Sequence, residues 1–128
     1  EESALTCIRF WRVLQESLPE LEGLLSGESQ AKLIKENYLY PYSIALQALA
    51  GVANQLIREN SKDWENDLSR AEKINWTREN PDWEGRAMTG GRLTTGGQHP
   101  AWTRNYLKLK MGLILNDEEK KLEGFLNG

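Results

Sequence analysis

Apolar residues recur at three- and four-residue spacing along most of this 128-residue chain, and that spacing constrains its fold more than any other feature. In the first segment Leu5, Ile8, Trp11 and Leu14 follow this period until Pro19 interrupts it. The period is that of an α-helix with one buried face, whereas a half-buried β-strand would alternate apolar and polar residues. No segment alternates convincingly, so the sequence predicts an all-α fold.

Proline and glycine divide this pattern into segments, because proline suits the first turn of a helix and glycine commonly follows its last residue. The first helix is expected to end before Pro19. Further helices are expected over residues 19–25, 29–40, 41–58 and 63–74, from Pro100 to Gly112, and from Asn116 onward. The pattern thus predicts one compact domain of six or seven helices spanning residues 1–128, with a long glycine-rich loop before the penultimate helix.

The same period predicts which side chains are buried. The helix over residues 41–58 carries apolar or small residues on both sides and is expected at the centre of the domain. Cys7 lies on the apolar face of the first helix and is expected to be buried there. The other residues expected to face the core are Trp64, Leu68, Ala71 and Ile74 of a surface helix, and Leu122, Phe125 and Leu126 of the last helix.

A loop of uncommon length is expected between residues 75 and 100. Asn80-Pro81 interrupts regular structure there, and five glycines fall within thirteen residues. Loops beyond about 12–15 residues are usually functional or disordered, so this one is the first place to look for a binding site. Trp76 and Trp83 are expected to anchor it to the helices, since burying an aromatic side chain contributes roughly 1.5–3 kcal/mol.

Composition narrows the class of protein. With 39% hydrophobic and 27% charged residues the chain is expected to be ordered and soluble. Its longest nearly apolar stretch, residues 44–53, is too short to cross a bilayer, and no signal-peptide pattern is present, so a cytoplasmic location is expected. The chain starts at Glu1 without an initiating methionine, which suggests a fragment of a longer protein.

The residues do not support catalysis. One cysteine and one histidine cannot make a disulfide or a zinc site, and neither a metal nor another cofactor is expected. No phosphate loop, dinucleotide-binding glycine motif, metalloprotease motif or nucleophile elbow is present. We therefore expect a protein that is not an enzyme and has no catalytic residues.

Charge is distributed unevenly along the chain. Residues 1–84 carry nine basic against fifteen acidic side chains, whereas residues 85–116 carry five basic side chains and no acidic one. Arginine and lysine bind phosphates, and aromatic rings stack on bases, so residues 85–116 predict a DNA-binding surface. The candidate contacts are Arg86, Arg92, Arg104, Lys108 and Lys110, with Trp102 and Tyr106 as stacking groups.

Two other interpretations of these cations stay open. The basic segment can be a solvated face that balances the acidic part of the same fold. Arg86 can also pair with a nearby acid, such as Asp82 or Glu84, instead of a phosphate.

The densest motif lies in the same region and resembles a known family. The run W-x-R-x-N-P-x-W-x-G-R-x-M extends from Trp76 to Met88, and N-Y-L-K-x-x-x-G-L extends from Asn105 to Leu113. Both are similar to the C-terminal part of DndB-like, DGQHR-domain-containing proteins of DNA sulfur modification. Gly97-Gln98-His99 echoes the DGQHR signature, but that signature belongs to the family's N-terminal half, so we assign no role to it here.

The resemblance implies a place in the bacterial DNA phosphorothioation system, in which sulfur replaces a non-bridging phosphate oxygen. It implies a DNA-associated regulatory module that contributes to DNA binding and to transcriptional control of the modification genes. Other proteins of the sulfur-modification system are further candidate partners. The alternative is a protein–protein interaction or dimerisation module. In that case DNA binding would reside in the missing N-terminal half of the longer protein.

Overall fold

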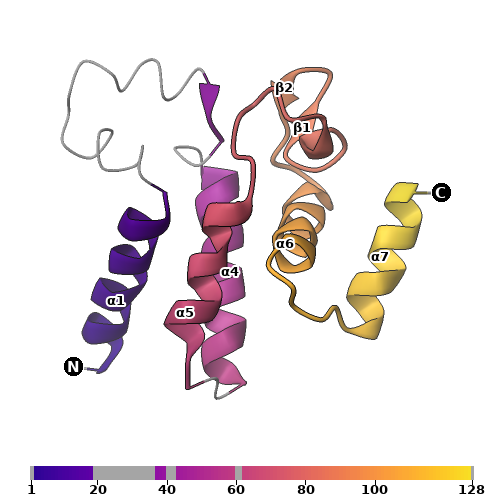
Figure 1. Ribbon diagram of the computed structural model, residues 1–128. Helices are drawn as coiled ribbons and strands as arrows, with labels where there is room; N and C mark the ends of the chain where they lie inside the picture. The colour runs from indigo at the N-terminus through magenta and orange to yellow at the C-terminus, as the bar shows by residue number, and fades with distance from the viewer. Residues whose placement is uncertain (1, 19–36, 40–42, 60–61, 128) are drawn as a thin grey trace.

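The computed structural model describes residues 2–18, 37–39, 43–59 and 62–127, and this part of the chain is mostly helical. Its five α-helices are α1 (Glu2–Ser17), α4 (Ser43–Arg58), α5 (Trp64–Leu68), α6 (His99–Lys110) and α7 (Asp117–Asn127). They lie side by side in Figure 1, with α4 and α5 between α1 and α6, and with α7 beyond α6. The helix expected over residues 19–25, and nearly all of that over residues 29–40, lie outside the described residues.

Helix α4 occupies the centre of the domain, as its two apolar sides predict. It packs against α6 on one side and α5 on the other. Ile44, Ala48, Leu49 and Val52 are all buried along it. Small residues at this interface allow the two helices to approach closely, and the side chain of Arg104 lies directly against Gly51.

The expected helix over residues 63–74 is present in two parts. An α-helical turn, α5, continues into a 3-10 helix, η1 (Ser69–Lys73). The four residues expected to face inward from this segment, Trp64, Leu68, Ala71 and Ile74, are all buried.

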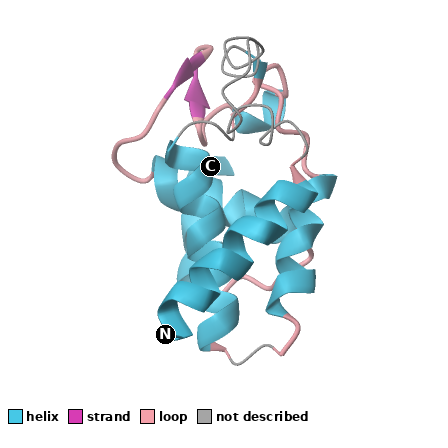
Figure 2. Cartoon of the chain, turned by 90° about the vertical axis from the view of Figure 1, so that its left-hand side faces the viewer, coloured by secondary structure: helices cyan, strands magenta, loops and turns pink. Residues whose placement is uncertain are grey.

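The glycine-rich loop is more regular than expected. It contains a short 3-10 helix, η2 (Pro81–Trp83), and a hairpin of β1 (Met88–Thr89) and β2 (Arg92–Leu93) with Met88 opposite Leu93. Gly90 and Gly91 join the strands with φ of 60° and 81°, the backbone that a tight two-residue hairpin turn requires. Strands of two residues are too short to produce an alternation, so the sequence pattern did not predict them. Figure 2 shows this sheet at one end of the molecule and the helices gathered below it.

Two tryptophans anchor this segment, as predicted. Trp83 is fully buried and stacks on Trp76 with 5.5 Å between ring centroids. The indole Nε1 of Trp83 donates to the Asn75 carbonyl at 3.1 Å, and that of Trp76 donates to the Ala71 carbonyl at 2.9 Å. The rings thus join the start of the loop to the end of η1.

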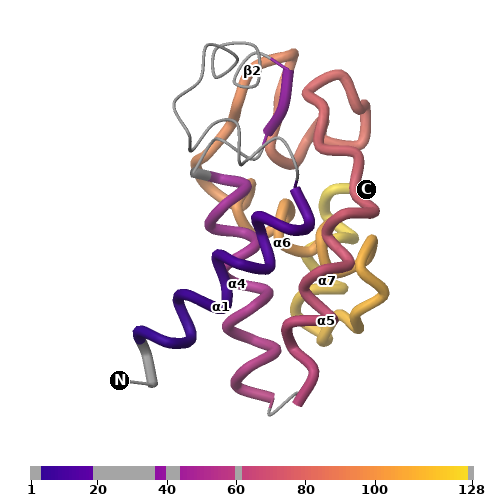
Figure 3. Tube along the Cα trace, turned by 60° about the vertical axis from the view of Figure 1, so that its left-hand side comes forward, coloured from indigo at the N-terminus to yellow at the C-terminus, as the bar shows by residue number. Residues whose placement is uncertain are grey.

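Three expectations about burial are wrong. On α1, Leu5 and Ile8 are 56% and 55% exposed, Trp11 is exposed, and so is Cys7. On α7, Phe125 is 70% exposed. The buried side of α1 passes through Phe10, Val13, Leu14 and Ser17, so most of the predicted face, with Leu5, Ile8 and Trp11, lies on the other side of the helix. The side that is buried is the one that another element covers. Figure 3 shows the N-terminal end of α1 protruding from the bundle.

Candidate nucleic-acid interface

The seven predicted contact residues come from three elements. Helix α6 carries five of them, Arg86 precedes β1, and Arg92 lies on β2. Successive residues of an α-helix are rotated by about 100°, so the five on α6 point in several directions. The structure separates the seven into an internal group, whose side chains hydrogen-bond neighbouring elements, and an exposed group, whose side chains reach solvent or a surface cleft.

Arg86 belongs to the internal group. Its guanidinium forms a two-point ion pair with Glu123 of α7, at 2.7 and 3.0 Å, and also donates to the Trp102 carbonyl at 2.7 Å. It lies over the ring of Tyr106, 5.2 Å from the centroid. The partner is therefore an acid 37 residues away rather than Asp82 or Glu84. Two parallel N–H···O bonds fix the angle at which α7 meets the loop.

Lys108 is the most deeply placed of the cations, with 1% of the residue exposed. Its Nζ donates to both carboxylate oxygens of Glu119, at 2.7 and 2.9 Å, and to Gln55 Oε1 at 2.9 Å. One ammonium therefore joins α6 to both α4 and α7. Asn105 strengthens the same junction, because its amide donates to the Glu119 carbonyl at 3.2 Å and to Glu123 at 3.3 Å.

Glu119 is also part of the N-terminal cap of α7. Its carboxylate accepts from the Asn116 N–H and its own N–H donates to Asn116 Oδ1, both at 2.8 Å. This reciprocal pair is a capping box, and it confirms the helix start predicted at Asn116. Burial alone would raise the pKa of Glu119, but the hydrogen bonds from Lys108 and Asn116 outweigh it and lower that pKa.

The two predicted stacking groups also make internal contacts. Tyr106 is buried with its ring edge against Trp83, at a centroid distance of 4.8 Å, and its hydroxyl donates to Asp82 at 2.8 Å. Trp102 is half-buried and its Nε1 donates to the Leu122 carbonyl at 2.9 Å. Both rings therefore fasten α6 to its neighbours.

Burial and the hydrogen bond to Asp82 raise the pKa of Tyr106 to about 12. Because an unfolded tyrosine has a pKa near 10, the neutral phenol stabilises the fold at all pH values below about 10, and this contribution is lost as the pH rises toward 12. Titration followed by phenolate absorbance should show one tyrosine ionising about two pH units after an ordinary tyrosine. In Tyr106→Phe this late step should disappear, and a late step that persists would contradict the assignment.

The exposed group consists of Arg92, Arg104 and Lys110. Arg92 is exposed on the hairpin. Lys110 is exposed near the end of α6, with its Nζ 3.9 Å from Asp82 and 5.6 Å from the centre of the Tyr106 ring. Arg104 is half-buried and points into a cleft between α6 and α4.

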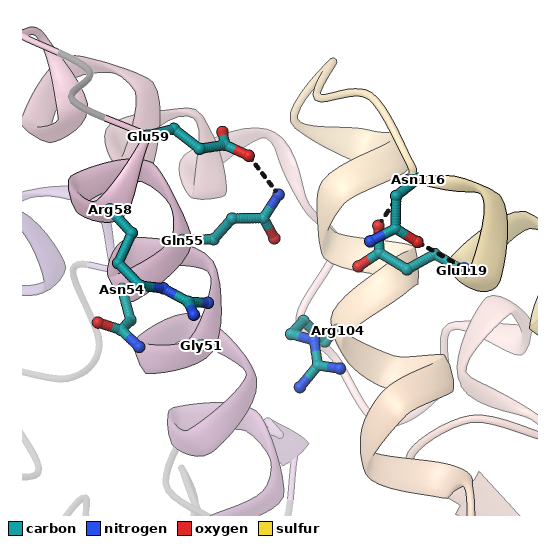
Figure 4. Close-up of a pocket in the computed structure, with 8 residues that line it drawn as sticks. All are labelled: Gly51, Asn54, Gln55, Arg58, Glu59, Arg104, Asn116 and Glu119. Carbon is teal, nitrogen blue, oxygen red and sulfur yellow. Dashed lines mark hydrogen bonds between the residues drawn. The ribbon is translucent and has the colours of Figure 1, made fainter.

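That cleft has a volume of about 560 Å³ and a largely polar lining. Helix α4 contributes Gly51, Asn54, Gln55 and Arg58 to it, and Glu59 follows (Figure 4). The facing wall consists of Arg104, Asn116 and Glu119.

Sequence reasoning missed Arg58, because that residue lies in the acidic part of the chain. A signal was available in the spacing. Gly51, Asn54 and Arg58 are three and four residues apart and form a polar strip on an otherwise apolar helix.

Among the described residues, no group of three or more histidine, cysteine, aspartate or glutamate side chains is arranged to hold a metal ion. None of the helices in the described ranges is both long and apolar enough to cross a membrane.

Comparison with known proteins identifies the family. Neither the curated proteins nor the solved structures contain a match to the chain. The family model described as DndB, DNA-sulfur modification-associated, matches residues 1–114. The match covers most of the chain, including the two motifs that carry the resemblance and all seven predicted contact residues. The chain therefore belongs to the DndB family of DNA-sulfur modification-associated proteins.

Proposed function

We propose that this chain is a DNA-associated regulatory module of a bacterial DNA phosphorothioation system. It contributes to DNA binding and to transcriptional control of the modification genes, acts in the cytoplasm, and binds rather than catalyses. Membership of a family associated with DNA sulfur modification supports the assignment of this chain to such a system. The segment of residues 85–116, with five basic and no acidic side chains, is the observation that carries the DNA contact.

Three of the predicted contacts reach solvent and form the proposed phosphate-binding set, namely Arg92, Arg104 and Lys110. Arg86 and Lys108 support this set indirectly, because their ion pairs with α7 hold the loop and α6 in place. Trp102 and Tyr106 would have to break internal hydrogen bonds to stack on a base. We therefore propose that binding depends on backbone phosphates and has little sequence preference.

The salt dependence of DNA binding tests this proposal. Three phosphate contacts give a slope of about −2.7 in log affinity against log salt, so affinity should fall roughly 40-fold between 50 and 200 mM salt. The double variant Arg92→Gln/Lys110→Gln should weaken binding and make the slope shallower by about 2. Lys121→Gln removes an exposed charge of α7 and is the matched control, which should leave the slope unchanged.

The alternative function is a protein–protein interaction or dimerisation module. The exposed Leu5, Ile8 and Trp11 on α1 favour it, because neighbouring apolar residues on an exposed helix face often mark a contact surface. Charge reversal in Arg92→Glu discriminates the two functions. Loss of DNA binding with an unchanged oligomeric state supports the phosphate contacts, whereas no DNA binding by the unmodified chain, even at low salt, supports the interaction module.

A further inference from the structure

Two arginines enter the cleft between α4 and α6 from opposite walls. Arg58 is the last residue of α4, and Arg104 lies in the middle of α6. Figure 4 shows both guanidinium groups turned toward the space between the helices. Within the described ranges, neither group has a hydrogen bond or an ion pair. Guanidinium groups present several N–H donors in a fixed plane, which suits the oxygens of a phosphate.

The acids in the cleft are already engaged by other groups. Glu59 accepts a hydrogen bond from the Gln55 amide at 3.1 Å. Glu119 accepts two from the buried Lys108 and one from the Asn116 N–H. Gln55 is neutral, so Glu59 keeps its charge, and Arg104 as well as Lys108 acts electrostatically on Glu119. Three cations against two carboxylates leave one net positive charge in and beside the cleft.

The remaining lining groups add donors and give the Arg104 side chain room beside α4. The Asn116 oxygen accepts the Glu119 N–H, which leaves its amide nitrogen to face a ligand. The Asn54 amide lines the same space. Gly51 leaves room for the Arg104 side chain, since a Cβ at position 51 would lie 3.0 Å from Arg104 Cδ. The cleft therefore presents donors from both walls before any ligand binds.

We propose that this cleft binds a phosphate group through Arg58 and Arg104. A cleft of about 560 Å³ has room for more than inorganic phosphate, and the source of the phosphate that we propose is either a nucleotide or the DNA backbone. The polar lining favours such a charged ligand over an apolar one. The proposal does not require the DNA-binding function, because a free nucleotide would satisfy the same donors.

Titration with inorganic phosphate at constant ionic strength tests the site, with the arginine side-chain N–H signals followed by NMR. The signals of Arg58 and Arg104 should shift and saturate, whereas that of Arg12, an exposed arginine of α1, should not. Arg104→Gln should weaken phosphate binding at least fivefold, and Arg12→Gln should leave it unchanged. Equal shifts at all three arginines, or full affinity in Arg104→Gln, would overturn the proposal.

A second variant tests the position of Arg104 without removing its charge. In Gly51→Ala the new Cβ would lie 3.0 Å from Arg104 Cδ, so the Arg104 side chain must shift by a few tenths of an ångström, while alanine keeps α4 helical because it favours helix more than glycine does. Phosphate binding should weaken, by less than in Arg104→Gln, with an unchanged circular dichroism spectrum. Unchanged affinity in Gly51→Ala would contradict the geometry proposed here.

Binding measurements with duplex DNA and with a mononucleotide identify the source of the phosphate. If the DNA backbone supplies it, Arg58→Gln should weaken binding of duplex DNA and of phosphate alike. If a nucleotide supplies it, deoxyadenosine monophosphate should bind more tightly than phosphate, and Arg58→Gln should leave duplex affinity unchanged. If the chain binds DNA through Arg92 but phosphate causes no saturable shift of the Arg58 and Arg104 signals, the proposed cleft site is wrong and the proposed function still stands.

Discussion

Replacing Trp83 with alanine should lower the free energy of unfolding by about 3–5 kcal/mol, the usual range for removing a buried tryptophan. Trp83 is fully buried between Trp76 and Tyr106, with ring centroids 5.5 and 4.8 Å away. Its indole N–H also satisfies the Asn75 carbonyl. Alanine would therefore leave a cavity, end two ring contacts and remove one of the two side-chain donors to the Asn75 carbonyl, the other being the Asn80 amide at 2.9 Å.

Urea denaturation, followed by circular dichroism, measures this effect. Trp83→Phe is the matched control, because phenylalanine keeps a ring in the cavity although it cannot donate to Asn75. Since most of the cavity stays filled, the loss of unfolding free energy in Trp83→Phe should be well below that in Trp83→Ala. No atom lies within 4 Å of the position that a Cβ would take at Gly90 or Gly91. Replacing either glycine therefore perturbs the hairpin turn and leaves the packing of the core unchanged. A loss of less than 1 kcal/mol in Trp83→Ala would show that this tryptophan does not anchor the loop.

Replacing Lys108 with alanine should also lower the free energy of unfolding by about 3–5 kcal/mol, since removing one partner of a buried ion pair leaves an uncompensated charge. Lys108 is 1% exposed, and its ammonium contacts Glu119 and Gln55 at 2.7 to 2.9 Å. Without it, the Glu119 carboxylate would face the junction of α4, α6 and α7 with no cation in contact. We expect α7 to detach more readily in this variant.

The double variant Lys108→Met/Glu119→Gln separates loss of the pair from loss of packing. Methionine fills much of the lysine volume, and glutamine keeps the capping box with Asn116 while removing the carboxylate charge. This variant should be at least about 2 kcal/mol more stable than Lys108→Ala, because no buried charge is left unpaired. Equal stability of the two variants would show that packing, not charge, explains the loss.

The pH dependence gives an independent check. Because the folded-state pKa of Glu119 is lowered, the pair stabilises the fold above the unfolded pKa of about 4.3, and this contribution is lost as the pH falls through the folded value. The difference in stability between the unmodified chain and Lys108→Ala should therefore be largest at neutral pH and shrink in acid. A difference that stays constant down to pH 2 would contradict the role of the ion pair.

Local features of this protein were predictable because they depend on neighbouring residues. The period of apolar residues predicted α1, the central α4 and α6. Asn116 before three acids predicted the start of α7, and its capping box forms between residues three apart. The motif from Trp76 to Met88 indicated the family, and its two tryptophans predicted the anchoring of the loop. Each signal lies within a few residues of the structure that it predicts.

The accessibility of the predicted contacts was not predictable in this way. Arg86 and Lys108 look like surface cations in the sequence, but their partners Glu123 and Glu119 are 37 and 11 residues away. The side of α1 that is buried, which excludes Ile8, and the exposure of Phe125 likewise depend on where the neighbouring elements pack. The cleft between Arg58 and Arg104 joins residues 46 positions apart.

The sequence by itself thus determined the helical class, the start of α7, the anchoring of the loop and the family, because short-range periodicity, capping and motif spacing encode them. The tertiary structure alone decided which of the predicted contact cations pair with α7 and which reach solvent. The physical reason is that an ion pair or a cleft requires two surfaces to meet, and the position of the second surface depends on how the helices pack against one another.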